Sequence, residues 1–287
     1  MIEITKNILK NIYKPRPEDA KKYDFGLLLV IGGSDFYSGS PALSALSAFK
    51  SGVDMVQIIA PKRAADIIAS FSPNLAAYPL EGSWLNKNHI ATLLSMTESA
   101  KAVAGGRMAV VIGGGLGRSE ETQEAILEYL SRVNVPAVID ADAIHAVSKN
   151  PEMVSGKNFL ITPHSREFFI LTNKDVSQLV EEEKIKLVES EAKRLQTTIL
   201  LKGKADIISN GQETAVDRSG TAFMTVGGTG DVLAGICGAI MARGVDPFVA
   251  GQAGVFINGK AGEAASRKMK EALTATDLIE AIPKVIF

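Results

Sequence analysis

Six short apolar segments recur along the chain, and each is followed by a turn and then by a segment with helical periodicity. They are residues 27–31 (LLLVI), 55–60 (MVQIIA), 108–112 (MAVVI), 135–139 (VPAVI), 158–162 (NFLIT) and 198–202 (TILLK). Strands that are apolar on both faces are typical of a parallel sheet whose helical crossovers cover both sides. No linker or internal repeat divides the chain. The sequence therefore predicts a single α/β domain over residues 1–287.

The pattern changes toward the carboxyl end of the chain. Residues 206–209 (DIIS) and 213–217 (ETAVD) flank an Asn210-Gly211 pair, which favours a tight hairpin turn. We therefore expect the mostly parallel sheet to carry an antiparallel hairpin at one edge.

Helix boundaries are predicted in three places. Ser40, followed by Pro41, is expected to cap a helix that ends at Gly52. Ser119 is expected to cap a second helix, and residues 177–196 have the charge and apolar spacing of a solvated amphipathic helix.

Composition excludes several classes of partner and location. The chain has 31 Lys and Arg against 32 Asp and Glu, so no basic field predicts binding to nucleic acid or to a membrane surface. Cys237 is the single cysteine, which fits a reducing compartment. The apolar stretch 232–242 is far shorter than the roughly 20 residues of a membrane span, and the first 20 residues lack a signal-peptide core. We expect a cytoplasmic protein.

Residues 227–231 (GGTGD) lead directly into a helix-period segment. Such a loop turns several backbone N–H groups toward one point at a helix amino terminus, where an anion such as phosphate is favoured. Asp231 is placed to accept a proton from a substrate hydroxyl beside that anion. The same residue suits a plain helix cap equally well, so both interpretations stay open here.

Two further glycine loops follow predicted strands, at residues 32–40 (GGSDFYSGS) and 113–117 (GGGLG). The loop 113–117 lacks the GxGxxG spacing of a dinucleotide fingerprint, and either loop alone is also explained by a tight strand-to-helix turn. Because ligands in open α/β sheets bind at the carboxyl ends of the strands, the loops after the predicted strands are expected to meet in one crevice.

Polar residues stand at the same strand ends. They are Asp140, Asp142, His164, Glu167 and Lys202. Three of them have a structural alternative, because Asp142 suits a helix cap, His164 a turn and Lys202 a surface charge. The three histidines have no spacing of paired metal ligands, which argues against a protein-built zinc site. Neither a P-loop nor a GxSxG nucleophile motif is present in the sequence.

Taken in order, six motifs resemble the NAD(P)H-hydrate dehydratase family. They are GGSDFYSGSPALSALSAFKSG, VIGGGLGR, VIDADAI, LITPHSRE, LLKG and FMTVGGTGDVLAG. The resemblance implies a ribokinase-like three-layer α/β/α sandwich that often assembles as a homotetramer. It implies that hydrated NADH and NADPH are dehydrated at the expense of ADP or ATP, with Mg2+ assisting. It also implies a stand-alone enzyme, working beside a separate NAD(P)H-hydrate epimerase.

The resemblance assigns roles to individual residues, with Asp231 as the catalytic base. The implied contacts to the hydrated dinucleotide are Ser40, Gly115, Gly117, His164 and Asp231. The implied contacts to the nucleotide are Lys202, Gly203, Lys204, Ala205, Asp206, Gly228, Thr229 and Gly230. It assigns no metal ligands.

Five positions depart from the residues usual in that family. Ser40 stands in place of alanine, Gly114 of proline, Arg166 of glycine, Asp206 of threonine and Asn258 of histidine. Arg166 adds bulk and positive charge beside His164. Two other functions therefore stay open: a small-molecule kinase of the hydroxyethylthiazole or hydroxymethylpyrimidine kinase type, and a non-catalytic nucleotide-binding sensor.

Overall fold

A computed structural model describes residues 2–287 of the chain. The strands are β1 (Ile2–Glu3), β2 (Leu27–Ile31), β3 (Met55–Pro61), β4 (Ala76–Leu80), β5 (Met108–Ile112), β6 (Ala137–Ile139), β7 (Phe159–Ile161), β8 (Thr198–Leu201), β9 (Asp206–Ser209) and β10 (Thr214–Asp217). Within the described residues they form one ten-stranded sheet in the order β1-β10-β9-β8-β7-β6-β5-β2-β3-β4.

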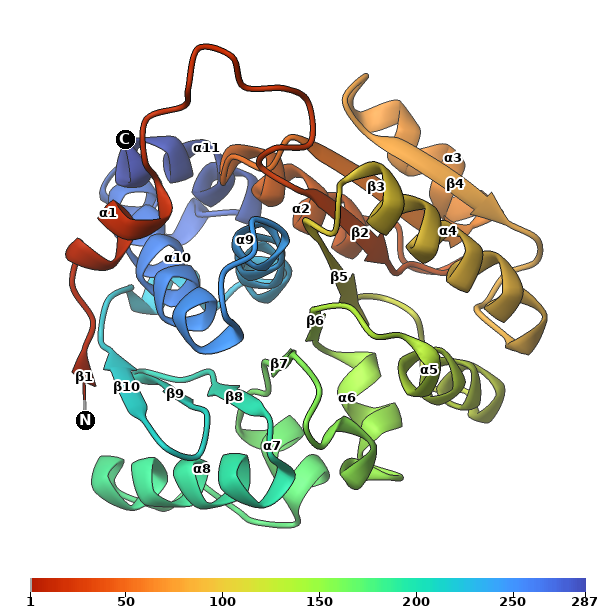
Figure 1. Cartoon of the computed structure of the whole chain (residues 1–287). Helices are drawn as coiled ribbons and strands as arrows, with labels where there is room; N and C mark the ends of the chain where they lie inside the picture. Colours follow the sequence, from red (N-terminus) through yellow and green to blue (C-terminus); the bar gives the residue numbers. More distant parts are fainter. Residues whose placement is uncertain (1) are drawn as a thin grey trace.

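Helices connect these strands and cover both faces of the sheet (Figure 1). The α-helices are α1 (Asn7–Ile12), α2 (Gly39–Lys50), α3 (Lys62–Phe71), α4 (Ile90–Val103), α5 (Glu120–Arg132), α6 (Asp142–Val147), α7 (Ser165–Thr172), α8 (Glu181–Leu195), α9 (Thr229–Ala242), α10 (Pro247–Met269) and α11 (Ala275–Ile286). Short 3-10 turns are η1 (Lys87–His89), η2 (Pro151–Val154), η3 (Ala222–Met224) and η4 (Lys270–Ala272).

Alternate residues of the central strands belong to two separate hydrophobic cores. In β2, Leu28 and Val30 pack with the helices of one face, among them α2, α9, α10 and α11. Leu27, Leu29 and Ile31 pack on the other face with helices α4 to α8. Figure 1 shows the blue helices α9 to α11 and the green helices α5 to α7 on opposite sides of the sheet. The predicted three-layer arrangement is confirmed.

All six predicted strands are present and pair in parallel with one another. The hairpin is confirmed too, since β9 pairs antiparallel with both β8 and β10. It is not the last pair of the sheet, however, because β1 adds parallel to β10 and forms the edge. The sequence pattern missed β1 and also β4, whose Pro79 and exposed residues lack the buried apolar run of a central strand.

Two of the predicted helix starts need correction. Helix α2 begins at Gly39, so Ser40 lies inside its first turn and does not cap it. Helix α8 begins at Glu181, several residues after the start of the predicted segment. The third is confirmed, because the Ser119 side chain accepts a hydrogen bond from the Thr122 N–H at the start of α5. No helix of the described residues is long and apolar enough to cross a bilayer.

Helices α2 and α9 pack closely together, and this contact positions the start of α9. A Cβ built on Gly235 would lie only 2.1 Å from the Ser44 carbonyl oxygen, so the two helices approach at a distance that glycine alone permits. The Ser44 hydroxyl donates to the Asp231 backbone carbonyl at 2.9 Å. The base candidate is therefore fixed to a second helix through its own main chain.

Candidate active site

The loops that follow the central strands are joined to one another by backbone hydrogen bonds. Gly33 N–H donates to the Gly114 carbonyl at 2.8 Å, which links the loops after β2 and β5. Lys202 N–H donates to the Pro163 carbonyl at 2.8 Å, and Lys202 forms an isolated parallel bridge with His164. The expected meeting of these loops at the carboxyl ends of the strands is confirmed.

Asp231 lies in the first turn of α9, three residues after the amino-terminal Gly228. Gly228 has φ +94°, and a Cβ there would lie 2.6 Å from a Leu43 methyl carbon, so this position requires glycine. No side chain caps the helix. The capping interpretation of Asp231 is therefore wrong, and its carboxylate lies instead beside Gly114 and Ser40.

The Asp231 carboxylate borders Gly114 and Ser40. A Cβ built on Gly114 would lie 2.9 Å from Asp231 Oδ1 and 2.9 Å from the Cβ of Ser40. Burial and the nearby negative charge of Asp140 raise the pKa of Asp231 to about 7, although a hydrogen bond from Ser40 and the charge of Lys202 oppose the rise. A carboxylate with a pKa near neutrality is well matched to general-base catalysis.

Lys202 occupies the centre of a charged cluster. Its Nζ lies 2.8 Å from Asp140 Oδ1 and 3.9 Å from Glu167 Oε2, and Thr162 donates to the same Asp140 oxygen at 2.8 Å. Burial alone would lower the pKa of Lys202, but the carboxylates of Asp140 and Glu167 outweigh it and raise the pKa. The side chain is only 19% exposed, so Lys202 is not the surface charge of the alternative interpretation.

We call residues 227–231 the anion loop. This loop and the segment 202–206 approach each other at Lys202. A Cβ on Gly230 would lie 3.6 Å from the Lys202 ammonium nitrogen. At the other end of the segment, Asp206 Oδ1 accepts a hydrogen bond from Gly203 N–H at 2.8 Å. Burial raises the pKa of Asp206 to about 7. Gly203 and Lys204 are exposed, and Ala205 is half-buried, so the backbone here is open to a ligand.

His164 stands at the amino-terminal cap of α7. Its Nδ1 accepts hydrogen bonds from the Arg166 and Glu167 N–H groups at 3.1 and 3.3 Å, and Glu167 Oε2 accepts from His164 N–H at 2.9 Å. An accepting Nδ1 leaves the proton of the neutral ring on Nε2. The turn interpretation is thus confirmed for Nδ1. The His164 side chain is 53% exposed, so a ligand can still reach the rest of the ring. Arg166 is exposed.

The third glycine loop is held in place by Asp142. Gly117 N–H donates to Asp142 Oδ2 at 2.9 Å, and Arg118 Nε lies 2.7 Å from Asp142 Oδ1. The helix-cap interpretation of Asp142 is wrong, because the residue lies in the first turn of α6 and its carboxylate bridges to the loop instead. Gly115 and Gly117 both have positive φ, at +71° and +85°. This loop therefore exposes backbone in a conformation that favours glycine.

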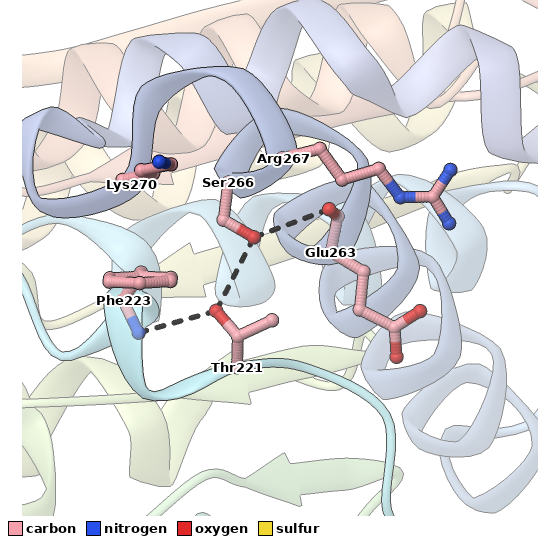
Figure 2. A pocket seen from close by; sticks show the side chains of 6 residues that line it. All are labelled: Thr221, Phe223, Glu263, Ser266, Arg267 and Lys270. Atoms are coloured by element: carbon pink, nitrogen blue, oxygen red, sulfur yellow. Dashed lines mark hydrogen bonds between the residues drawn. The ribbon is translucent and has the colours of Figure 1, made fainter.

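A pocket that sequence reasoning missed is formed by residues around η3 and the carboxyl-terminal part of α10. It has a volume of about 410 Å3 and is lined by Thr221, Phe223, Glu263, Ser266, Arg267 and Lys270 (Figure 2). The Thr221 hydroxyl accepts from Phe223 N–H at 3.2 Å and donates to Ser266 Oγ at 3.4 Å. The only hint in the sequence is that Phe223 lies four residues before GGTGD, which begins at Gly227. The α10 residues have no local signal, and folding alone brings them there.

Asn258, one of the departures from the family pattern, is buried in the middle of α10. Its Oδ1 has no hydrogen-bond partner among residues 2–287. Within the same residues, no three or more His, Cys, Asp or Glu side chains are grouped to hold a metal ion.

The geometry can be compared with known proteins. The family model described as NAD(P)H-hydrate dehydratase matches residues 28–284, which include all six motifs. The chain belongs to the NAD(P)H-hydrate dehydratase family. This membership does not favour the kinase and sensor alternatives, although both use parts of the same fold.

Two curated relatives are similar over part of the family domain. The bifunctional NAD(P)H-hydrate repair enzyme of Pyrobaculum aerophilum is 43% identical over 169 residues, which are 58% of this chain and 32% of that protein. The ATP-dependent (S)-NAD(P)H-hydrate dehydratase of Schizosaccharomyces pombe is 35% identical over 170 residues, which are 58% of this chain and 52% of that protein. The chain thus aligns with a third to a half of these relatives.

Solved structures confirm the ribokinase-like fold of this family member. A ribokinase-like superfamily protein from Enterococcus faecalis superposes with a TM-score of 0.82 at 23% identity, covering 99% of this chain and 95% of the other. The ADP/ATP-dependent NAD(P)H-hydrate dehydratase of Bacillus subtilis superposes with a TM-score of 0.78 at 23% identity, covering 98% of this chain and 96% of the other. A hydroxyethylthiazole kinase from Pyrococcus horikoshii superposes with a TM-score of 0.63 at 17% identity, covering 97% of this chain and 92% of the other.

Proposed function

We propose that this protein dehydrates hydrated NADH and NADPH back to the reduced cofactors and cleaves ADP or ATP in doing so. The observation that carries the proposal is the position of Asp231, whose carboxylate borders the substrate loop at Gly114 while the same helix start presents the anion loop toward Lys202. A base and a phosphate site thus lie side by side, as transfer of a phosphoryl group to a substrate hydroxyl requires.

The residues divide between two ligands. The hydrated dinucleotide contacts Ser40, Gly115, Gly117, His164 and Asp231. The nucleotide contacts Lys202, Gly203, Lys204, Ala205, Asp206, Gly228, Thr229 and Gly230. We assign the pocket at Phe223 and Arg267 to the rest of the nucleotide, because it offers an aromatic ring, hydroxyls and cations.

In the first step, Asp231 removes the proton of the hydroxyl on the hydrated ring carbon. The resulting oxygen attacks the terminal phosphorus of ADP or ATP, and AMP or ADP leaves. The N–H groups of residues 228–230 and the Lys202 ammonium stabilise the charge on the transferred phosphoryl oxygens. Asp231 is ionised often enough for this role at neutral pH because its pKa is about 7.

In the second step, the carbon–oxygen bond to phosphate breaks. The lone pair of the ring nitrogen assists departure, and loss of a proton from the neighbouring carbon restores the dihydronicotinamide ring. Phosphate leaves more readily than hydroxide, which explains why dehydration is coupled to nucleotide cleavage. The net products are the reduced cofactor, inorganic phosphate and AMP or ADP.

Mg2+ belongs with the nucleotide in this proposal. The described residues do not form a cage for a protein-held ion, and Asp140 and Glu167 are engaged by Lys202. Mg2+ is commonly held mainly by substrate phosphates and water. We therefore assign no residue as its ligand, and no step above depends on one.

The test is recovery of absorbance at 340 nm from NADH hydrate with Mg2+ and ADP, ATP or no nucleotide, with phosphate release followed in parallel. We expect nucleotide-dependent recovery with one phosphate per NADH formed. A stable phosphorylated product would instead indicate a kinase, and binding of nucleotide without turnover on either hydrate would indicate a sensor.

The family resemblance also leads us to propose that the chain acts as one domain, assembles as a homotetramer and works in the cytoplasm beside a separate epimerase. Light scattering of the purified protein tests the tetramer, for which a monomeric mass would be the contrary result. Localisation of a tagged full-length protein tests the compartment. Addition of an epimerase to a mixture of both epimers of the hydrate tests the partnership, because it should raise the yield of NADH.

A further inference from the structure

Three large aromatic side chains are exposed beside the candidate substrate loop. Phe36 is 80% exposed, Tyr37 52% and Trp84 43%. We call these three residues the aromatic rim. Phe36 and Tyr37 lie in the loop after β2 and their rings meet edge to face at 5.1 Å, whereas Trp84 lies in the loop after β4. The loops are joined, since Asp35 N–H donates to the Ser83 carbonyl at 3.0 Å.

The rim packs directly on the glycines proposed to contact the hydrated dinucleotide. A Cβ on Gly115 would lie 2.8 Å from the Cβ of Tyr37, and a Cβ on Gly117 would lie 2.9 Å from Cζ3 of the Trp84 indole. The third glycine loop therefore runs between the rim and the crevice that holds Asp231. A ligand lying on Gly115 and Gly117 would touch these rings.

The Trp84 indole is exposed although its backbone is firmly anchored. The next residue, Leu85, is completely buried, and its carbonyl accepts a hydrogen bond from Thr122 Oγ1 at 2.9 Å. Asn86 then caps η1 with its side chain. A clustered apolar surface presented by an ordered backbone is typical of a binding site. Aromatic rings on such a surface stack well on nucleic-acid bases.

The two ligands approach Asp231 from different sides. Lys202 and Gly230 lie together on the nucleotide side, whereas Gly114 and Ser40 border the carboxylate on the side of the third glycine loop. From Asp231, the loop leads in order past Gly114 to Gly115 beside Tyr37 and then to Gly117 beside Trp84. A dinucleotide with its reacting ring at Asp231 and its chain along this loop would reach the rim. Its remote end carries a flat adenine base.

We propose that the aromatic rim, and Trp84 in particular, stacks on the adenine base of the hydrated dinucleotide and so selects dinucleotides over the corresponding mononucleotide. This inference rests on the proposed function. It makes Trp84 a specificity-determining residue that lies away from the reacting atoms. Trp84 strengthens substrate binding and leaves the rate of the chemical step unchanged.

Trp84 is the only tryptophan of the chain, so its fluorescence reports on the rim directly. Titration with NADH hydrate in the absence of nucleotide should change its emission without turnover, and the hydrated nicotinamide mononucleotide, which lacks adenine, should not. In Trp84→Ala, KM for NADH hydrate should rise about tenfold or more with unchanged kcat, because stacking on one base contributes about that much affinity. Trp84→Phe should retain most of the affinity.

Phe71→Ala is the matched control, because Phe71 is an exposed aromatic at the end of α3, outside the rim. Its KM should equal that of the unmodified protein. The inference would be overturned if Trp84 emission did not change on titration with NADH hydrate and KM were unchanged in Trp84→Ala. A changed oligomeric mass with an unchanged KM would overturn it as well and assign the rim to a contact between subunits. Absence of turnover in the unmodified protein would instead contradict the proposed function, while the titration still reports whether Trp84 meets the dinucleotide.

Discussion

At the scale of single residues, Asp231 combines two properties that seldom occur together. Its backbone is fixed by Ser44, and its carboxylate is disfavoured as an anion by burial and by Asp140. The helix start next to it favours anions, but that effect acts on the bound phosphate as well. The environment therefore keeps the proposed base near its titration point, and the adjoining loop is the proposed phosphate site.

Replacing this base provides the sharpest test. Asp231→Asn should retain nucleotide binding, because the loop N–H groups remain, and should lose turnover by about 10²–10⁴-fold. In the unmodified enzyme, kcat/KM should rise with pH and level off above about 7, since the base acts when it has lost its proton. Calorimetry with ADP and a pH series of the 340 nm assay measure both; near-normal turnover in the variant would remove Asp231 from the mechanism.

Asp206 gives a second test, because it stands where relatives usually carry threonine. Its pKa of about 7 means that the carboxyl is mostly neutral at pH 6 and mostly ionised at pH 8, where it repels the phosphates of a bound nucleotide. Asp206→Asn should therefore lower KM for ADP at pH 8 by roughly fivefold, equivalent to about 1 kcal/mol, and have little effect at pH 6. Equal changes at both pH values would show that the charge of Asp206 is not the cause.

At the scale of elements, the site depends on how closely α2 and α9 pack. Both helices contribute to the crevice, α2 through Ser40 and α9 through the anion loop and Asp231. Small residues at the contact, among them Gly235, let the helix axes approach. The glycines and alanines of α9 are thus packing residues, and only its first turn carries a residue proposed to act in catalysis.

Adding one methyl group at this contact should disturb both stability and activity. Gly235→Ala places its Cβ against the Ser44 carbonyl and the Ser47 hydroxyl, so we expect a loss of about 1–3 kcal/mol in the free energy of unfolding, together with lower turnover. Gly39→Ala is the control, because no atom lies within 4 Å of a Cβ there. Thermal melts and the 340 nm assay compare them, and an unaltered melt in Gly235→Ala would contradict the packing argument.

At the scale of the whole molecule, Arg243 ties the amino-terminal segment to the end of α9. It donates to the Gly52 carbonyl at 3.0 Å and to the Ile12 carbonyl at 3.1 Å. Its guanidinium also lies 5.1 Å from the Tyr13 ring centroid and 4.9 Å from that of Phe25. Arg243 follows the carboxyl end of α9, whereas Asp231 lies at the beginning of that helix, so stability and catalysis are separable here.

Removal of this link should affect stability alone. Arg243→Ala should lower the free energy of unfolding by about 1.5–3 kcal/mol, the range for hydrogen bonds to a charged donor, with KM and kcat unchanged. Arg243→Lys keeps the charge but lacks the planar guanidinium with its paired N–H donors, so it should recover only part of the lost free energy of unfolding. Urea unfolding curves provide the comparison; a large change in KM would mean that the amino-terminal segment influences the site.

The sequence by itself determined the six central strands, the hairpin, the anion loop and the polar residues at strand ends, because buried parallel strands and glycine turns leave strong local patterns. It could not decide between a capping and a crevice-facing Asp231, or between a surface and a cluster-bound Lys202. Those outcomes depend on contacts with Gly114 and Asp140, which lie far away in the chain. The pocket at Phe223 and the aromatic rim were likewise decided only by tertiary structure, since each combines segments that local sequence patterns cannot relate.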